Sequence, residues 1–333
     1  MSNTALCVQL QQALTEVAGA NAPALKRDRV GFVEALQSPA NLNGVRRVAV
    51  PGNGKRRQVE LIYLQRGVEA GVQAAQPTAF CDASDQPEPR SMLVEVEHWV
   101  HRKLRFTEEE LRRYCWADDP VFVANAILAE LNALTVAVNK VLLTLQAANL
   151  GAFFDGSSVK NISWLDAQNQ PQYFEESKLL EEYSLIGGSG QPLVIGAGDL
   201  AHYTRMTRKG CCTASGLDLG QAGEYSFFYD RFVNTAFASG EHYLVLAPGA
   251  VQLVTWNANV GDYARQEGRN ESGTLVDPFT GLRFDLDQVW DACTKRYHLT
   301  IALNYGLVVL PPDAFALGDE LAGVNYSLHF QKS

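Results

Sequence analysis

The stretch PVFVANAILAELNALTVAVNKVLLTLQAANL, residues 120–150, carries the strongest structural signal in this sequence. Asp119 can cap a helix that begins at Pro120, and Gly151 can take the left-handed conformation that ends it. A polar residue also returns at every seventh position, at Asn125, Asn132, Asn139 and Gln146. With apolar residues at helical spacing between them, the pattern predicts one helix of about 46 Å that lies as a spine across a sheet.

A membrane span is the alternative reading of this apolar stretch. Glu130 and Lys140 would then lie near the middle of the bilayer, where a charged side chain costs about 3 kcal/mol or more. The polar edge of the helix would face lipid as well. We therefore expect a helix inside a folded protein body and no membrane contact.

The residues before the spine divide into an arm and a strand-rich loop. Leu6, Leu10, Leu14 and Val17 predict an amphipathic helix within residues 4–18. The mixed stretch 19–43 offers little for a core, so we interpret residues 1–44 as an arm that is ordered by lying on another copy of the chain.

Residues 45–104 have the pattern of an extended β-hairpin loop. Strand signals at 45–50 and 58–65 flank a Pro-Gly-Asn-Gly turn, and a third strand is predicted over 92–100. Between them, residues 68–90 are small and polar. Strands around so long a tip expose unpaired edges, which are a hazard unless they are meant to pair with another chain.

The charge of the chain is uneven along its 333 residues. Residues 1–66 hold nine Lys/Arg and four Asp/Glu, whereas the remainder holds 19 and 33, and the net charge is −9. A basic arm on an acidic body favours contacts with other copies of the chain, with weak contact to nucleic acid as the alternative. The residues that we expect at such a subunit interface are Arg46, Arg47, Lys55, Arg56 and Arg57.

Motifs for phosphate, nucleotide or acyl chemistry are incomplete. GNGK at 52–55 lacks the spacing of a phosphate loop, GGSG at 187–190 lacks the last glycine of a nucleophile elbow, and IGAG at 195–198 lacks the third glycine of a dinucleotide fingerprint. His98 and His101 lie in a strand-like run, where residues three apart face opposite sides.

Cysteines and paired glutamates do not build a site either. The six cysteines show no metal-ligand spacing, no signal peptide precedes Cys7, and we expect reduced thiols, with Cys293 packed in the interior. The pairs at 175–176 and 181–182 are typical of a solvated face. We therefore expect no catalytic residue, no cofactor and no metal, and a structural role instead of an enzyme.

The carboxyl half alternates apolar and polar residues in several short runs. Strands are predicted within 187–198, 242–256, 280–286, 297–310 and 324–331, and a helix over 200–209. Together with the spine helix this composition predicts an α+β body.

This order of parts resembles the Hong Kong 97-type major capsid protein of tailed bacteriophages. The phrases that carry the resemblance are FTEEELRRYC (106–115), PLVIGAGDL (192–200), GCCTASGLDL (210–219), APGAVQLVTWN (247–257) and TGLRFDLDQVWDACTKRYHLTIALNYGLVVLPPDAF (280–315). The resemblance covers roughly residues 45–320. It implies a viral structural protein of the virion that self-assembles, as hexamers and pentamers, into the icosahedral head around double-stranded DNA.

The resemblance also implies a division of the chain. Residues 1–44 would be the N-terminal arm, and 45–104 the extended loop, or E-loop. Residues 105–186 and 300–333 would form the peripheral domain with its spine helix at 120–150, and 187–299 the axial domain. Portal, scaffolding and decoration proteins are the other partners that it implies, with assembly in the cytoplasm of the host bacterium.

Two other classes stay open at the level of sequence. An encapsulin-like compartment would share the fold and hold enzymes instead of a genome, with a cargo groove near the amino-terminal helix. A soluble enzyme with an unfamiliar site would show a pocket in which perturbed titratable groups converge.

Overall fold

The computed structural model describes residues 11–19, 28–42, 45–50, 57–64, 89–107, 120–188, 190–208, 225–237, 240–257, 272–291, 293, 296–311 and 326–333. Residues 11–19 are helical. The helices that follow are α2 (Gly31–Gln37), α3 (Pro39–Leu42), α5 (Pro120–Ala147), α6 (Tyr173–Leu185), α7 (Gly198–Arg208) and the 3-10 helix η2 (Val233–Ala236). The strands are β1 (Val45–Val50), β2 (Gln58–Leu64), β3 (Pro89–Glu95), β4 (His98–Thr107), β5 (Lys160–Ile162), β6 (Leu193–Gly196), β7 (Ser226–Tyr229), β8 (His242–Leu246), β9 (Val251–Trp256), β10 (Ser272–Val276), β11 (Arg283–Asp291), β12 (Arg296–Val309) and β13 (Ser327–Lys332).

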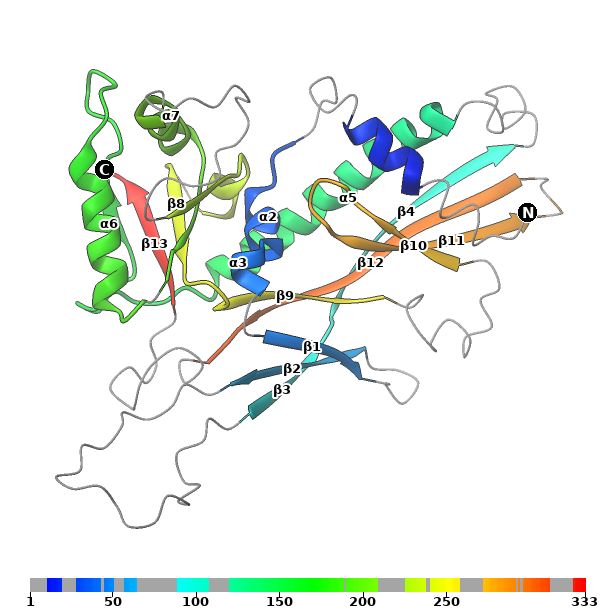
Figure 1. Ribbon diagram of the computed structural model, residues 1–333, viewed down its shortest axis with the longest axis horizontal. Coiled ribbons are helices and arrows are strands. Elements are labelled where there is room, and N and C mark those ends of the chain that lie inside the picture. The colour runs from blue at the N-terminus through cyan, green and yellow to red at the C-terminus, as the bar shows by residue number, and fades with distance from the viewer. Residues whose placement is uncertain are drawn as a thin grey trace, which may run out of the picture.

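Three sheets arrange these strands along an elongated molecule (Figure 1). The hairpin sheet has the order β1-β2-β3. The body sheet has the order β10-β11-β12-β4, and β9 also pairs with β12. The end sheet has the order β5-β13-β8-β6-β7. The described elements therefore form the α+β architecture that the sequence predicts.

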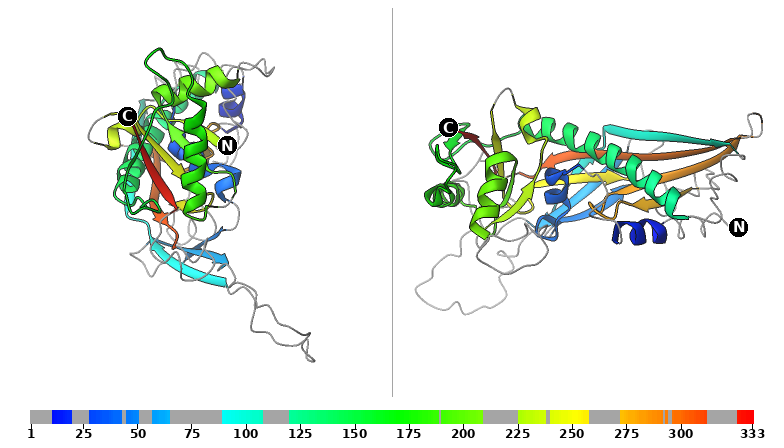
Figure 2. Two further views of the ribbon diagram at one scale, coloured as in Figure 1. Left: turned by 90° about the vertical axis from the view of Figure 1, so that its left-hand side faces the viewer. Right: turned by 90° about the horizontal axis from the view of Figure 1, so that it is seen from above.

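Helix α5 lies along one face of the body sheet, as its apolar spacing predicts (Figure 2). Leu131, Val138 and Leu142 of α5 are buried in one core with Ile301 and Leu303 of β12. Its 28 residues rise about 42 Å at 1.5 Å per residue, so one helix supports most of the length of the sheet.

The second half of the polar edge of α5 is buried and bonded to other parts of the chain. Asn139 and Gln146 have no exposed surface. Asn139 donates to Asp230, and Gln146 donates to the hydroxyl of Ser327. By length and composition Ala124–Ala147 could cross a membrane, with a mean hydropathy of 1.6, but half of that window is buried against this protein. The contacts explain the apolar composition as that of a core helix.

Helix α5 ends three residues before the predicted end. The Asn149 side chain donates to the carbonyl of Leu145, and Gly151 donates its N–H to Ser327 at 2.8 Å. Gly151 therefore bonds to β13 and does not have the positive φ of a left-handed cap. The cap predicted at Asp119 lies outside the described residues. So does the short helix predicted at Thr107–Glu110, apart from Thr107 itself.

The third strand predicted over 92–100 is two strands with different partners. β3 pairs with β2 in the hairpin sheet, and β4 pairs with β12 from His98 to Thr107 in the body sheet. Val96 and Glu97 separate them. Residues 98–104, which the sequence places in the extended loop, thus belong to the body.

Strand pairing also divides the carboxyl half differently from the predicted boundaries. β10 and β11, expected in a separate axial domain, pair with β12 beside α5. β13, expected with the spine, instead pairs with β8 and β5 in the end sheet. The resemblance implies the predicted grouping, and long-range pairing sets which strands share a sheet.

The described part of the arm packs on its own chain. Leu14 and Val17 of the helix at 11–19 are buried in the main core, and so are Phe32 and Leu36 of α2. The prediction that residues 1–44 have little core of their own is therefore wrong for this part. Polar side chains of α5 accept hydrogen bonds from the backbone of residues 28–33. The sequence alone does not indicate these partners.

Candidate subunit interface

The hairpin sheet has two faces that differ in their surroundings. β1 and β3 each pair antiparallel with β2, and side chains opposite one another share a face. Arg46 lies opposite Ile62 on one face, and Arg47 lies opposite Leu61 on the other. Because successive residues of a strand alternate in direction, adjacent arginines serve different surfaces.

The inner face of the hairpin sheet packs on the body. Every second residue of β2 is buried there in a small hydrophobic cluster with residues of β9 and the end of β12. Its buried members are Val59, Leu61, Tyr63, Val254, Trp256 and Leu310. This cluster attaches the base of the hairpin to its own subunit.

Arg47 reinforces the attachment from the inner face. It is half-buried, and its Nη2 donates to Oε1 of Gln252 at 2.6 Å. Gln252 is buried and donates in turn to the carbonyls of Asn41 and Gly249, both at 2.9 Å. Burial lowers the pKa of the Arg47 guanidinium below its ordinary value. Arg47 is thus engaged within its own chain.

Arg57 makes a second attachment where β2 begins. Its guanidinium donates to Oδ1 of Asn304 in β12 and lies 5.3 Å from the centre of the Trp256 ring. The Asn304 amide donates to the carbonyl of Trp256 at 3.4 Å. A cation over an indole with a bonded amide beside it holds the strand in a fixed orientation.

The outer face of the hairpin sheet is open. Arg46 is exposed, and Leu93 of β3, which lies opposite Glu60, has 55% of its surface exposed. Ile62 lies between them on the same face. A large apolar side chain held in water beside charged neighbours is typical of a protein contact surface.

The five predicted interface residues therefore separate into three groups. Arg47 and Arg57 hold the hairpin to its own body, and Arg46 points outward. Lys55 and Arg56 lie outside the described residues. Sequence reasoning missed Gln252 and Asn304, because two isolated amides on separate strands give no local signal.

The IGAG motif at 195–198 connects β6 to α7, but a side chain already occupies the N-terminus of α7. The carboxylate of Glu241 accepts from the N–H of Asp199 at the start of α7, with Oε1 at 3.1 Å. A Cβ on Gly198 would meet the same carboxylate oxygen at 1.3 Å. An intramolecular anion thus takes the place that a bound phosphate would need.

His98 and His101, the histidines with zinc-like spacing, lie apart, and neither meets a cysteine among the described residues. His98 lies beside Tyr305 with ring centres 5.5 Å apart, and His101 stacks on Trp99 at 4.1 Å, on the other face of β4. Among the residues with described positions, no three His, Cys, Asp or Glu side chains group as metal ligands. Cys293 is exposed, so the prediction that it packs in the interior is wrong.

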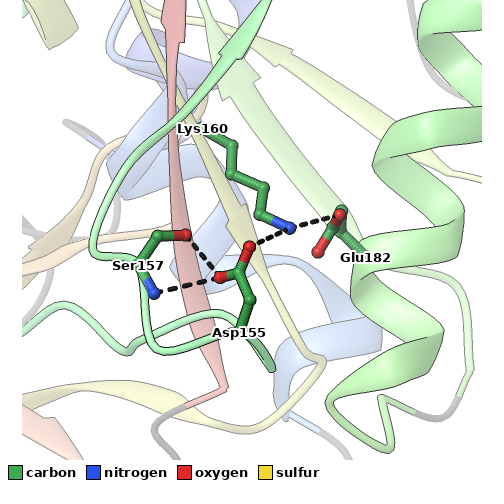
Figure 3. A network of polar contacts seen from close by, with 4 residues as sticks. All are labelled: Asp155, Ser157, Lys160 and Glu182. Carbon is green, nitrogen blue, oxygen red and sulfur yellow. Dashed lines mark hydrogen bonds and ion pairs between the residues drawn. The ribbon is translucent and has the colours of Figure 1, made fainter.

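Several glutamates of α6 make contacts inside the chain instead of forming a solvated face. Figure 3 shows Lys160 between Asp155 and Glu182, with Nζ–O distances of 2.9 and 2.5 Å. Hydrogen bonds from the hydroxyl and N–H of Ser157, and then from Lys160, hold the pKa of Asp155 well below its usual range. Glu176 accepts from Tyr203 at 2.9 Å. The network fastens the segment after α5 to α6.

Solved structures share this arrangement. A chain of the cyanophage A-1(L) capsid asymmetric unit superposes with a TM-score of 0.52 at 12% identity, over 89% of this chain and 98% of that one. The chain has the Hong Kong 97-like capsid fold. No protein-family model and no curated protein matches the sequence.

Further structures with this capsid fold align less closely. A chain from Mycobacterium phage Che8 gives a TM-score of 0.45 at 11% identity, over 86% of this chain and 92% of that one. A chain from the capsid of a native GTA particle gives 0.44 at 11% identity, over 89% and 91%.

Proposed function

We propose that this chain is the major capsid protein of a tailed bacteriophage. It would assemble as hexamers and pentamers into an icosahedral head around double-stranded DNA, and would have no catalytic role. The observation that carries the proposal is the likeness to the cyanophage capsid chain, which extends over 98% of that chain. The exposed outer face of the hairpin sheet supports it.

Neighbouring subunits would meet on that outer face. Arg46, Ile62 and Leu93 together offer a cation and two apolar side chains, while the inner face keeps the hairpin at a fixed angle to its body. One such contact is modest in energy. In a closed lattice every subunit makes several contacts at once, so modest contacts suffice for a stable shell.

The three sheets correspond to three parts of the proposed shell subunit. We assign the body sheet with α5 to the peripheral domain and the end sheet with α6 and α7 to the axial domain around the capsomer axes. The hairpin sheet would be the base of the extended loop. This assignment is supported by the strand pairing.

The acidic balance of the chain suits a container for DNA. With a net charge of −9, the subunit would neutralise few phosphates and bind packaged DNA without sequence specificity. Portal, scaffolding and decoration proteins would be its other partners. Assembly in the cytoplasm of a host bacterium would precede its place in the virion.

Sedimentation of the purified chain tests the proposal. Analytical ultracentrifugation across a concentration series is expected to show a cooperative change from small species to one fast-sedimenting closed particle. Monomers or dimers that persist at every concentration, with and without the scaffolding partner, would contradict a shell subunit and favour a soluble enzyme.

The content of native particles separates a phage head from an encapsulin-like compartment. The likeness to the cyanophage capsid favours the phage head. Particles recovered from the source are expected to protect double-stranded DNA from nuclease. Particles that contain an enzyme and no protected DNA would support the compartment.

A further inference from the structure

Two histidines that are 87 residues apart in the sequence meet inside the end sheet. Nδ1 of His242 in β8 lies 2.9 Å from Nε2 of His329 in β13. The side chain of Phe237 stacks on both rings, with centres 4.6 Å from His242 and 4.2 Å from His329. The two histidines are 3% and 5% exposed. The pair is therefore a buried polar contact at the junction of β8 and β13, which we call the seam.

The seam lies where the carboxyl-terminal strand enters the sheet. β13 is inserted between β8, with which it pairs antiparallel, and β5, with which it pairs parallel. Its first residue, Ser327, is bonded to Gly151 and to Gln146 of the spine helix. Loss of β13 would separate β5 from the rest of the sheet and remove the contact between the sheet and the end of α5.

We propose that the His242–His329 pair is a pH-sensitive contact that keeps β13 in the end sheet while the rings are neutral and releases it when they are protonated. The ligand of the site is the proton. The proposal does not depend on whether the chain forms shells, because it concerns the fold of one subunit.

The number of protons on the ring nitrogens explains why acid opens the contact. In the neutral pair, one N–H donates to the lone pair of the other ring, and the outer nitrogens do not take part in this bond. A first added proton on an outer nitrogen leaves that bond in place but buries a cation. A second proton makes both rings cationic with facing nitrogens 2.9 Å apart, a like-charge contact that burial does not screen.

The ionisable groups on the elements of the sheet are engaged elsewhere. Next to His242, the Glu241 carboxylate accepts from Asp199 N–H and the Tyr243 hydroxyl. In β13, Lys332 pairs with the Asp199 carboxylate. In β5, Lys160 lies between Asp155 and Glu182 (Figure 3).

On the other side of the seam, the charged side chains with described positions have partners of their own. In α5, Lys140 lies over the Phe232 ring at 4.8 Å. Before η2, Asp230 accepts the N–H groups of Phe32 and Phe232 and the amide of Asn139, while Arg231 pairs with Asp28. Helix η2 has the sequence VNTA and holds no ionisable side chain.

The direction of the pH effect follows from linkage. Burial, and then the charge of His242, lower the pKa of His329 to about 4, from an ordinary value near 6.5. Between these values the opened strand binds a proton that the closed strand does not. The opening equilibrium should therefore rise about 80-fold from pH 6.5 to pH 4 through His329 alone. Burial raises the pKa of Glu241, which acts in the opposite direction.

Hydrogen–deuterium exchange of the full chain tests the proposal. After correction for intrinsic rates, the amides of β13 and β8 should open tens to hundreds of times more readily at pH 4.5 than at pH 7, while those of β11 change little. His329→Gln should remove this pH dependence. The matched control is His202→Gln, an exposed histidine of α7 in the same part of the fold, which should retain it.

A titration by NMR keeps the test decisive if the variant does not fold. The ring signal of His329 in the unmodified chain should titrate well below its ordinary value near pH 6.5. Ordinary titration of the buried His329 ring near pH 6.5 would overturn the proposal. Equal opening of β13 at pH 7 and pH 4.5 would overturn it as well.

Discussion

Asn139 is the residue at which three distant segments of the chain meet. Its Oδ1 accepts the N–H of Val33 at 3.2 Å, and its Nδ2 donates to Oδ2 of Asp230 at 2.8 Å. The same carboxylate oxygen accepts the N–H of Phe32 at 2.9 Å. Burial raises the pKa of Asp230, so these bonds offset part of the cost of placing a carboxylate in the interior.

Replacing this amide should loosen the amino-terminal segment. Asn139→Leu keeps the volume but removes the acceptor of Val33 N–H and one of the hydrogen bonds to the buried Asp230 carboxylate, which should cost about 1–3 kcal/mol. Asn125→Leu, two polar steps earlier on the same helix and partly exposed, is the control. Denaturant unfolding should separate the two variants, and equal stabilities would contradict the role of Asn139.

Gly31 is required by a close backbone approach. A Cβ at this position would lie 2.5 Å from the carbonyl oxygen of Tyr229, which neither backbone can avoid without moving. Gly31→Ala should therefore lower the free energy of unfolding by about 1–3 kcal/mol. Gly19→Ala, where no atom lies within 4 Å, should be neutral or slightly stabilising in thermal unfolding. A neutral Gly31→Ala would show that α2 does not pack on β7.

At the residue scale the sequence reveals kinds of side chains but not their partners. The repeat of amides on the spine is visible at every seventh position, yet their acceptors and donors lie about a hundred residues away. Arg46 and Arg47 are equal candidates in sequence, and only the alternation of β1 assigns one outward and one inward. Long-range pairing is the missing information.

At the element scale, the hairpin sheet offers a matched pair of leucines. Leu61 has no exposed surface and lies on the inner face, whereas Leu93 is 55% exposed on the outer face. Leu61→Ala should destabilise the isolated subunit by about 2–4 kcal/mol through the cavity that it leaves. Leu93→Ala should leave that stability unchanged and reduce the yield of assembled particles in sedimentation. Loss of subunit stability in Leu93→Ala, with no such loss in Leu61→Ala, would contradict the assignment of the two faces.

Elements with a strong periodic pattern could be predicted, and their sheet partners could not. The spacing of residues 120–150 gives α5 to within three residues of its observed end. The run over 92–100 looks continuous, but it divides because β3 and β4 belong to different sheets. β13 likewise carries a strand pattern, although nothing local indicates that it joins β8 and β5.

At the scale of the whole molecule, the arm and the hairpin differ in how they relate to the body. The described part of the arm is buried in the main core, so one subunit orders it without a neighbour. The hairpin sheet is attached by one face and open on the other. Contacts between subunits are therefore expected at the hairpin, and less at residues 11–19 and 28–42.

Single-particle electron microscopy of assembled particles tests the central claim most directly. The account predicts closed shells of hexamers and pentamers in which the body of a neighbouring subunit covers Arg46 and Leu93 while Arg47 stays on Gln252. A preparation without closed shells, or shells in which the outer face of β1–β3 is bathed in solvent, would contradict it.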